Sequence, residues 1–272
     1  MQDFSRFGRF IGRTRMGGGG AFRGGGGGYG GGGFGGGGPT QMSFGPGMTP
    51  VVRAFIMACA AVYVLQILAP QVMIYFALIP AQFFSGYIWQ LVSFNFLHGP
   101  LMHILMNLFM IWMFGSEIEM MMGRRRFIIL MAVSGMGAGF CQALFSVLGG
   151  GPEAQIPIIG ASGIVFGLLL VYGMTWPNRQ VLVMFIIPMR VKWMVVIFGV
   201  IEFLAVVGDR QPGVAHLAHL GGMLFAYIFV RYDKVYMRLR RAYYERKLKR
   251  YRSRFSVHEG GKKDRDDGPT VH

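Results

Sequence analysis

A serine and a histidine stand within apolar stretches of the chain, where polar side chains are costly. Ser162 follows Gly160-Ala161, and His219 follows Ala218. A serine hydroxyl is a weak nucleophile until a base takes its proton, and a neutral imidazole is the usual base near neutral pH. The pair therefore predicts hydrolysis in which Ser162 is the nucleophile and His219 is the base.

Two further polar side chains can stabilise an oxyanion. His103 and Asn107 stand four residues apart, so they share one face of a helix and can point into a common cavity. We expect these side chains and the backbone N–H of Ser162 to donate to the oxyanion. Glu202 is assigned to hydrogen bonding between helices, so the expected site is a dyad without a third carboxylate.

The segments around the serine and the histidine also contain small residues at helical spacing. One segment carries Gly163 and Gly167, and the other carries Gly222 and Ala226. Small residues four apart let helix backbones approach closely in lipid. The two segments are therefore expected to pack tightly, as a hydrogen bond between serine and histidine requires.

The composition indicates the solvent in which these residues work. Apolar residues make up 53% of the 272 residues and charged residues only 14%, and the mean hydropathy is +0.44. A membrane helix needs about 20 apolar residues. Six segments meet this requirement loosely, which predicts an all-α membrane protein with spans at 51–69, 101–120, 127–148, 160–176, 191–207 and 214–231.

Basic residues predict the orientation of these spans. The net charge is +15, and the basic residues gather at the two ends and in the loops that follow the second and fourth predicted spans. Because loops rich in basic residues stay on the cytoplasmic side, this distribution places both termini in the cytoplasm. Their distribution fits anionic lipid better than a nucleic-acid partner. The polar residues of the second, fourth and sixth spans then lie near the outer face, where they predict a shared site.

The chain divides into three parts by composition. Residues 1–50 form a glycine-rich tail without enough apolar surface to fold, residues 51–233 form the membrane domain, and residues 234–272 form a basic cytoplasmic tail. The motifs carry no signal for an oligomeric state.

Three motifs, in this order and on these spans, resemble the rhomboid intramembrane serine proteases. They are His103-x-x-x-Asn107, Gly160-Ala161-Ser162-Gly163 and Ala218-His219-x-x-Gly222. The resemblance implies a six-helix bundle, a Ser162–His219 dyad, and oxyanion support from His103 and Asn107, with Gly160 and Gly163 beside the serine. It also implies cleavage of single-span membrane proteins near the outer face, without cofactor or metal, in a bacterial plasma membrane.

The chain departs from the family pattern at two positions. Gln90 stands where an Arg is typical after Trp89, and Phe166 stands one turn after Ser162 where a Tyr is common. The Phe166 ring can still pack on His219, but it brings no hydroxyl. Neither change removes a catalytic group.

Two other functions are compatible with parts of this pattern. An inactive rhomboid-like protein would bind membrane clients without cutting them, although such relatives usually lose Ser162 or His219. A metal or proton transporter would use His98, His103, His216 and His219 as ligands, but it leaves the Gly-Ala-Ser-Gly motif unexplained.

The glycine-rich tail is predicted to be dispensable for catalysis. Deleting residues 1–45 should leave cleavage in detergent unchanged, because this composition does not order against the bundle. The measurement is the cleavage rate of a single-span substrate by the truncated and the full chains. Loss of activity on truncation would contradict the prediction.

Overall fold

The computed structural model describes residues 47–183, 186–208 and 215–252. The chain forms two compact units, Met1–Val230 and Arg231–His272, and helix α11 (His216–Arg252) contains residues of both. The predicted glycine-rich tail lies almost entirely outside the described residues, as does the end of the basic tail. The functional residues predicted above all belong to the first unit.

The first unit is built from long apolar helices. These are α2 (Pro50–Leu68), α6 (Leu101–Met110), α7 (Ser116–Met122), α8 (Arg124–Leu148), α9 (Ser162–Thr175), α10 (Val191–Gly208) and the start of α11. A π-helical turn at Ile111–Gly115 joins α6 to α7, so these two form one continuous helix.

Short elements connect the long helices. Between α2 and α6 lie α3 (Val72–Phe76), α4 (Pro80–Phe84), α5 (Gln90–Ser93) and a 3-10 turn at Phe94–Phe96, while Pro152–Gln155 forms another 3-10 turn. An antiparallel hairpin of β1 (Gln180–Val183) and β2 (Ile187–Arg190) precedes α10. The sequence analysis did not predict this hairpin.

Four helices of the described chain are long and apolar enough to cross a membrane, namely Pro50–Leu68, Leu101–Met122, Arg124–Leu148 and Val191–Gly208. They coincide with four of the six predicted spans. Helix α9, at the fourth predicted span, has only 14 residues, and α11 extends well past the predicted end of the sixth. The count of six spans therefore stays a prediction.

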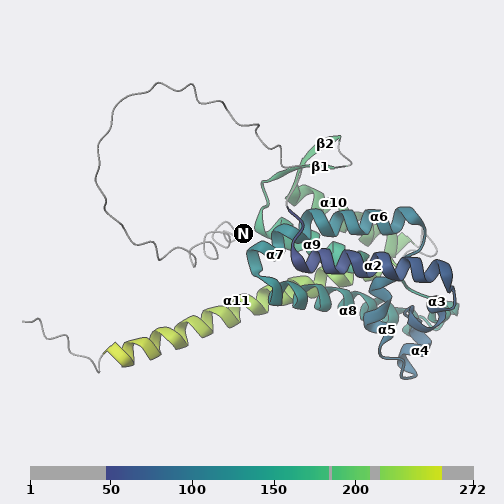
Figure 1. Ribbon diagram of the computed structural model, residues 1–272, viewed down its shortest axis with the longest axis horizontal. Helices are drawn as coiled ribbons and strands as arrows, with labels where there is room; N and C mark the ends of the chain where they lie inside the picture. The colour runs from purple at the N-terminus through teal and green to yellow at the C-terminus, as the bar shows by residue number, and fades with distance from the viewer. Residues whose placement is uncertain (1–46, 184–185, 209–214, 253–272) are drawn as a thin grey trace, which may run out of the picture. The chain divides into compact units, whose positions relative to one another are not determined.

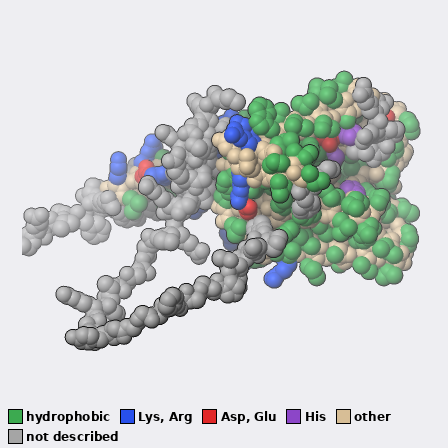
Figure 2. Space-filling view, turned by 90° about the horizontal axis from the view of Figure 1, so that it is seen from above, with side chains coloured by type: hydrophobic (Ala, Val, Ile, Leu, Met, Phe, Trp, Pro, Cys, Tyr) green, Lys and Arg blue, Asp and Glu red, His purple; other side chains and the backbone are tan. Residues whose placement is uncertain are grey.

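The outer surfaces of these helices are apolar. Only Val52 and Cys59 are buried among the 19 residues of α2, while side chains such as Leu68 and Val207 are largely exposed. Figure 2 shows apolar side chains spread over the visible face of the first unit. An apolar surface of this extent needs lipid as its solvent, because water would penalise it.

Helix α9 is the centre of the first unit. It packs against α8, α10 and the helix formed by α6 and α7, and Figure 1 shows it among them. Ten of its 14 residues are buried. A helix that is apolar all round belongs inside a bundle, so α9 holds its first residue, Ser162, in a fixed place.

Glu119 ties the beginning of α2 to α7. Its carboxylate accepts hydrogen bonds from Thr49 Oγ1 at 2.5 Å and from the backbone N–H groups of Val51 and Val52 at 3.1 Å. These N–H groups have no partner within their own helix. Glu119 thus caps α2 from 67 residues away in the chain.

Helices α9 and α11 approach backbone to backbone. A Cβ atom added at Gly222 would lie 2.8 Å from the carbonyl carbon of Gly163, and one added at Gly167 would lie 3.1 Å from the carbonyl oxygen of Gly222. No side chain fits at this crossing. Ala226, one turn further along α11, is fully buried.

We predict that Gly222→Val destabilises the fold by about 1–3 kcal/mol, because the added methyl groups would push α11 away from α9. The measurement is thermal unfolding in detergent. Gly199→Val is the matched control, since a Cβ at Gly199 in α10 would meet nothing nearer than Met223 Cε at 3.7 Å. Equal stability of the two variants would contradict the close crossing.

Candidate active site

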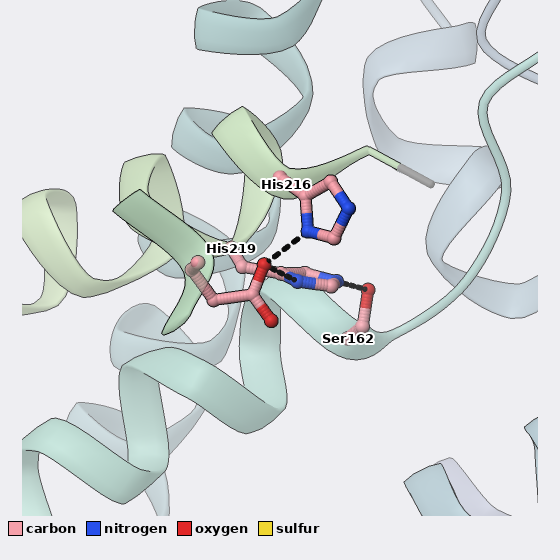
Figure 3. A network of polar contacts seen from close by, with 4 residues as sticks. Ser162, His216 and His219 are labelled. Carbon is pink, nitrogen blue, oxygen red and sulfur yellow. Dashed lines mark hydrogen bonds and ion pairs between the residues drawn. The ribbon is translucent and has the colours of Figure 1, made fainter. Parts of the chain in front are cut away.

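Ser162 and His219 meet across the crossing of α9 and α11. Ser162 Oγ lies 2.8 Å from His219 Nε2, a hydrogen bond between residues 57 positions apart. Ser162 is the first residue of α9, and His219 lies in the first turn of α11. Figure 3 shows the imidazole edge directed at the serine hydroxyl. This is the geometry that a serine nucleophile and its base require.

The ring of His219 is held flat against Phe166. The two ring centroids are 4.3 Å apart, and the ring planes differ by 9°. Phe166 lies one turn after Ser162 on α9, so one helix supplies both the hydroxyl and the surface on which the imidazole rests. Stacking needs only the aromatic face, which a phenylalanine provides without a hydroxyl.

Glu202 of α10 contacts the other side of His219. Its Oε2 atom lies 2.9 Å from His219 Nδ1, and the carboxylate is buried. The oxygen lies off the line of an Nδ1–H bond, so the contact is electrostatic rather than a well-aligned hydrogen bond. No sequence motif indicated a carboxylate beside the base, and the Ser162–His219 dyad stays a prediction.

Sequence reasoning missed this contact because no motif connects α10 to α11. One signal did exist, since Glu202 is the only acidic residue of α10. An ionisable side chain within an apolar helix usually faces a partner. Glu202 and the two histidines all fall in the outer halves of their predicted spans, and this shared position along the membrane normal indicates the contact better than any motif.

His216 shares the same carboxylate oxygen. Its Nδ1 atom lies 2.6 Å from Glu202 Oε2, and its ring centroid is 6.2 Å from that of His219. A spacing of three residues puts both rings on one face of α11. Figure 3 shows His216 and His219 near each other, with dashed lines marking the contact of each ring to the same oxygen. His216 thus makes a hydrogen bond to Glu202, in keeping with a packing or hydrogen-bonding residue.

His103 lies beside the loop that leads into α9. Gly160 has a φ of +117°, and a Cβ there would come within 2.8 Å of the His103 Cε1 atom. This left-handed backbone favours glycine. A glycine at position 160 therefore both turns the chain and makes room for the imidazole.

His98 supports the same loop. Its Nε2 atom accepts the backbone N–H of Ala161 at 3.5 Å, and its Nδ1 atom bonds to the carbonyl of Phe96 at 3.2 Å. Burial, with a smaller contribution from neighbouring His103, lowers the pKa of His98 to about 4. The ring is consequently neutral at neutral pH and can accept the Ala161 N–H.

Asn107 is buried beneath His103 on α6. Its amide nitrogen donates to the carbonyl oxygen of His103 at 3.0 Å. The amide is thus bonded to its own helix, and its role as an oxyanion donor stays a prediction.

Gln90, which stands in place of the family's Arg, is fully buried in the first loop. It accepts the backbone N–H of Ile79 at 3.1 Å and donates to the side chain of Gln82 at 2.8 Å. Gln90 therefore stabilises this loop with neutral hydrogen bonds.

The four histidines of the described residues fall into two pairs. The rings of His98 and His103 lie 5.4 Å apart next to the loop before α9. Among the described residues, Glu202, His216 and His219 form the one group whose ligand atoms lie close enough to hold a metal ion, within 4.8 Å of one another. The four-histidine site of a transporter is not assembled here.

Known proteins match this chain over its helical domain. A family model described as Rhomboid domain matches residues 85–234, which is more than half of the chain. Rhomboid protease GlpG of Yersinia pestis (strain Pestoides F) is 28% identical over 193 residues, which cover 68% of this chain and 63% of that protein. Rhomboid protease GlpG of Yersinia enterocolitica serotype O:8 / biotype 1B is also 28% identical, over 195 residues, with the same coverage.

The match thus spans a little less than two thirds of those relatives' own length. The residues matched by the family model include every motif residue discussed above, and the apolar helices agree with the match in making this an integral membrane protein. The chain therefore belongs to the rhomboid family.

Proposed function

We propose that this protein is an intramembrane serine endopeptidase that cuts membrane-spanning segments near the outer face. The observation that carries the proposal is the hydrogen bond of 2.8 Å between Ser162 Oγ and His219 Nε2. The rhomboid proteases that this chain resembles support the same reading. Its substrates would be single-span membrane proteins. It would lie in the plasma membrane of a bacterium, and both of its own termini would face the cytoplasm.

The reaction follows from the positions of these two groups. Ser162 Oγ attacks the peptide carbonyl while His219 Nε2 takes the hydroxyl proton. His219 then returns this proton to the leaving amine, which breaks the peptide bond and leaves an acyl group on Ser162. A water molecule, deprotonated by the same imidazole, hydrolyses the ester and frees the enzyme.

Glu202 favours the state of His219 that this reaction needs. A neutral imidazole carries one N–H, and only the form protonated at Nδ1 leaves Nε2 free to accept the serine proton. The carboxylate oxygen 2.9 Å from Nδ1 stabilises that form and also the imidazolium produced during attack. Glu202 acts as a positioning residue, since it touches the base and not the substrate.

The N-terminus of α9 supports the oxyanion. The first N–H groups of a helix lack carbonyl partners within it and carry partial positive charge. Ser162 is the first residue of α9, so its own N–H belongs to this set. The His103 ring lies next to Gly160 and is one of the two side-chain donors that the sequence predicted.

The length of α9 supports a site within the membrane. Fourteen residues at about 1.5 Å each give roughly 21 Å, less than the roughly 30 Å of a hydrocarbon core. If α9 ends near the inner face, Ser162 lies below the outer surface. Polar side chains within a span usually face a water-filled cavity, so those around Ser162 would let water reach the serine at this depth.

The two other candidate functions are separable by experiment. An inactive client-binding protein would keep the fold but show no turnover. A transporter would move an ion across liposomes independently of Ser162, and such transport by Ser162→Ala would contradict the protease proposal.

We expect Ser162→Ala to lose at least about 10³-fold in cleavage rate of a single-span model substrate, because the nucleophile is gone. Ser85→Ala is the control, since the exposed Ser85 hydroxyl donates to the backbone carbonyl of Ala81, and its loss leaves the candidate site untouched. A fluorophosphonate probe should label the wild type, and labelling should vanish in His219→Ala. Equal cleavage by wild type and Ser162→Ala would overturn the proposal.

Glu202→Gln should lower kcat by about 10–100-fold with little change in KM, because the carboxylate acts on the base rather than on substrate binding. This loss is smaller than in a well-aligned triad because the contact is off-axis. The control is Glu153→Gln, which removes an exposed carboxylate. A rise in KM alone, or a loss explained by unfolding in a melting experiment, would contradict the positioning role.

A further inference from the structure

We propose that Glu202, His216 and His219 form a binding site for a transition-metal cation of the Zn²⁺ class, and that the bound ion switches off proteolysis. The inhibitory half of this inference rests on the proposed function, whereas the binding half does not. The ion is an inhibitor here and takes no part in the reaction.

The three ligand atoms already converge on one point. Glu202 Oε2 lies 2.6 Å from His216 Nδ1 and 2.9 Å from His219 Nδ1. Ligands at about 2.0 Å from a tetrahedral zinc lie roughly 3.3 Å from one another. The carboxylate oxygen therefore has to move away from each imidazole nitrogen by less than about 1 Å, while all three ligand atoms already lie within 4.8 Å of one another.

The ligand set suits zinc more than the common hard cations. Two imidazoles and one carboxylate are the ligands of several zinc sites, which keep a fourth position for water. Calcium and magnesium prefer oxygen ligands. The carboxylate also supplies the negative charge that lowers the cost of holding a cation in a medium of low polarity.

The arrangement without an ion leaves one oxygen shared between two rings. His216 has a good hydrogen bond to it, while the contact to His219 Nδ1 is poorly aligned. An ion at this position would give every ligand atom a partner of the right kind. The α11 spacing of His216-x-x-His219 keeps both donors on one face, so no helix needs to move.

The three side chains are not completely covered by the protein. The side chains of His216 and His219 each keep 12% of their surface exposed, and Glu202 keeps 11%. Figure 2 shows histidine side chains at the surface of the first unit, surrounded by apolar side chains. The side chains are thus partly open, although His219 Nδ1 itself is buried and a side chain must shift to admit an ion.

Binding would block catalysis through the tautomer of His219. A metal ion at Nδ1 moves the imidazole proton to Nε2, because a neutral ring carries only one N–H. Nε2 then faces Ser162 Oγ, 2.8 Å away, as a donor and cannot accept the hydroxyl proton. The nucleophile stays protonated while the rest of the site is unchanged.

Binding is tested on the full-length Ser162→Ala protein, purified in detergent and stripped with EDTA, by calorimetric titration with ZnCl₂. We expect one ion per chain, and adding His216→Phe should weaken binding at least about tenfold. His258→Asn is the matched control for adventitious binding, at a histidine outside the described residues. Equal affinity with and without His216→Phe would overturn the site.

Inhibition is tested by following cleavage of a single-span substrate by the wild type. At a zinc concentration ten times the Kd, the rate should fall about tenfold and return when EDTA is added, and MgCl₂ should have no effect. The rate ratio with and without zinc should be close to one in His216→Phe. Equal inhibition of the wild type and His216→Phe would overturn the inference.

The two halves fail separately. A wild-type chain that cuts nothing, while Ser162→Ala binds zinc through His216, would support the metal site and refute the proposed protease. A chain that cuts its substrate but binds no zinc would leave the protease intact and refute the metal site.

Discussion

The backbone contact between Gly163 of α9 and Gly222 of α11 is the constraint on which the site depends. Gly163 directly follows Ser162, and Gly222 lies one turn after His219, so the glycine contact fixes the separation of hydroxyl and imidazole. In lipid, where apolar side chains gain little by leaving their solvent, close packing of small residues holds helices together. The Ser162–His219 hydrogen bond of 2.8 Å is a consequence of that packing.

The lipid around the helices also explains why several polar side chains gather at one place. Each of Glu202, His216 and His219 would be costly alone in an apolar helix, and together they satisfy one another around one oxygen. Phe166 adds an apolar surface that orients the central ring. The cluster concentrates its polar groups on one side of α9, and the rest of that helix remains apolar.

In the proposed site, Nδ1 of His219 next to Glu202 can carry either a proton or a metal ion, and the two have opposite effects on catalysis. A proton on Nδ1 facing Glu202 prepares the base, and a metal ion in the same place removes it. Because His216 reaches the same oxygen at 2.6 Å, the group is both a support for the base and a set of metal ligands. In the proposed enzyme, catalysis and inhibition are thus alternatives at one atom of one ring.

The sequence by itself determined the membrane class and the approximate positions of four long helices, and it singled out Ser162 and His219 as candidates, because hydropathy, helical spacing and intramembrane polar residues are local signals. Only the tertiary structure decided that Glu202 reaches His219, that Asn107 bonds to its own helix, and that α9 is a short central helix. These facts depend on how each helix is rotated about its axis. That rotation comes from packing between helices distant in the chain, which no single segment encodes.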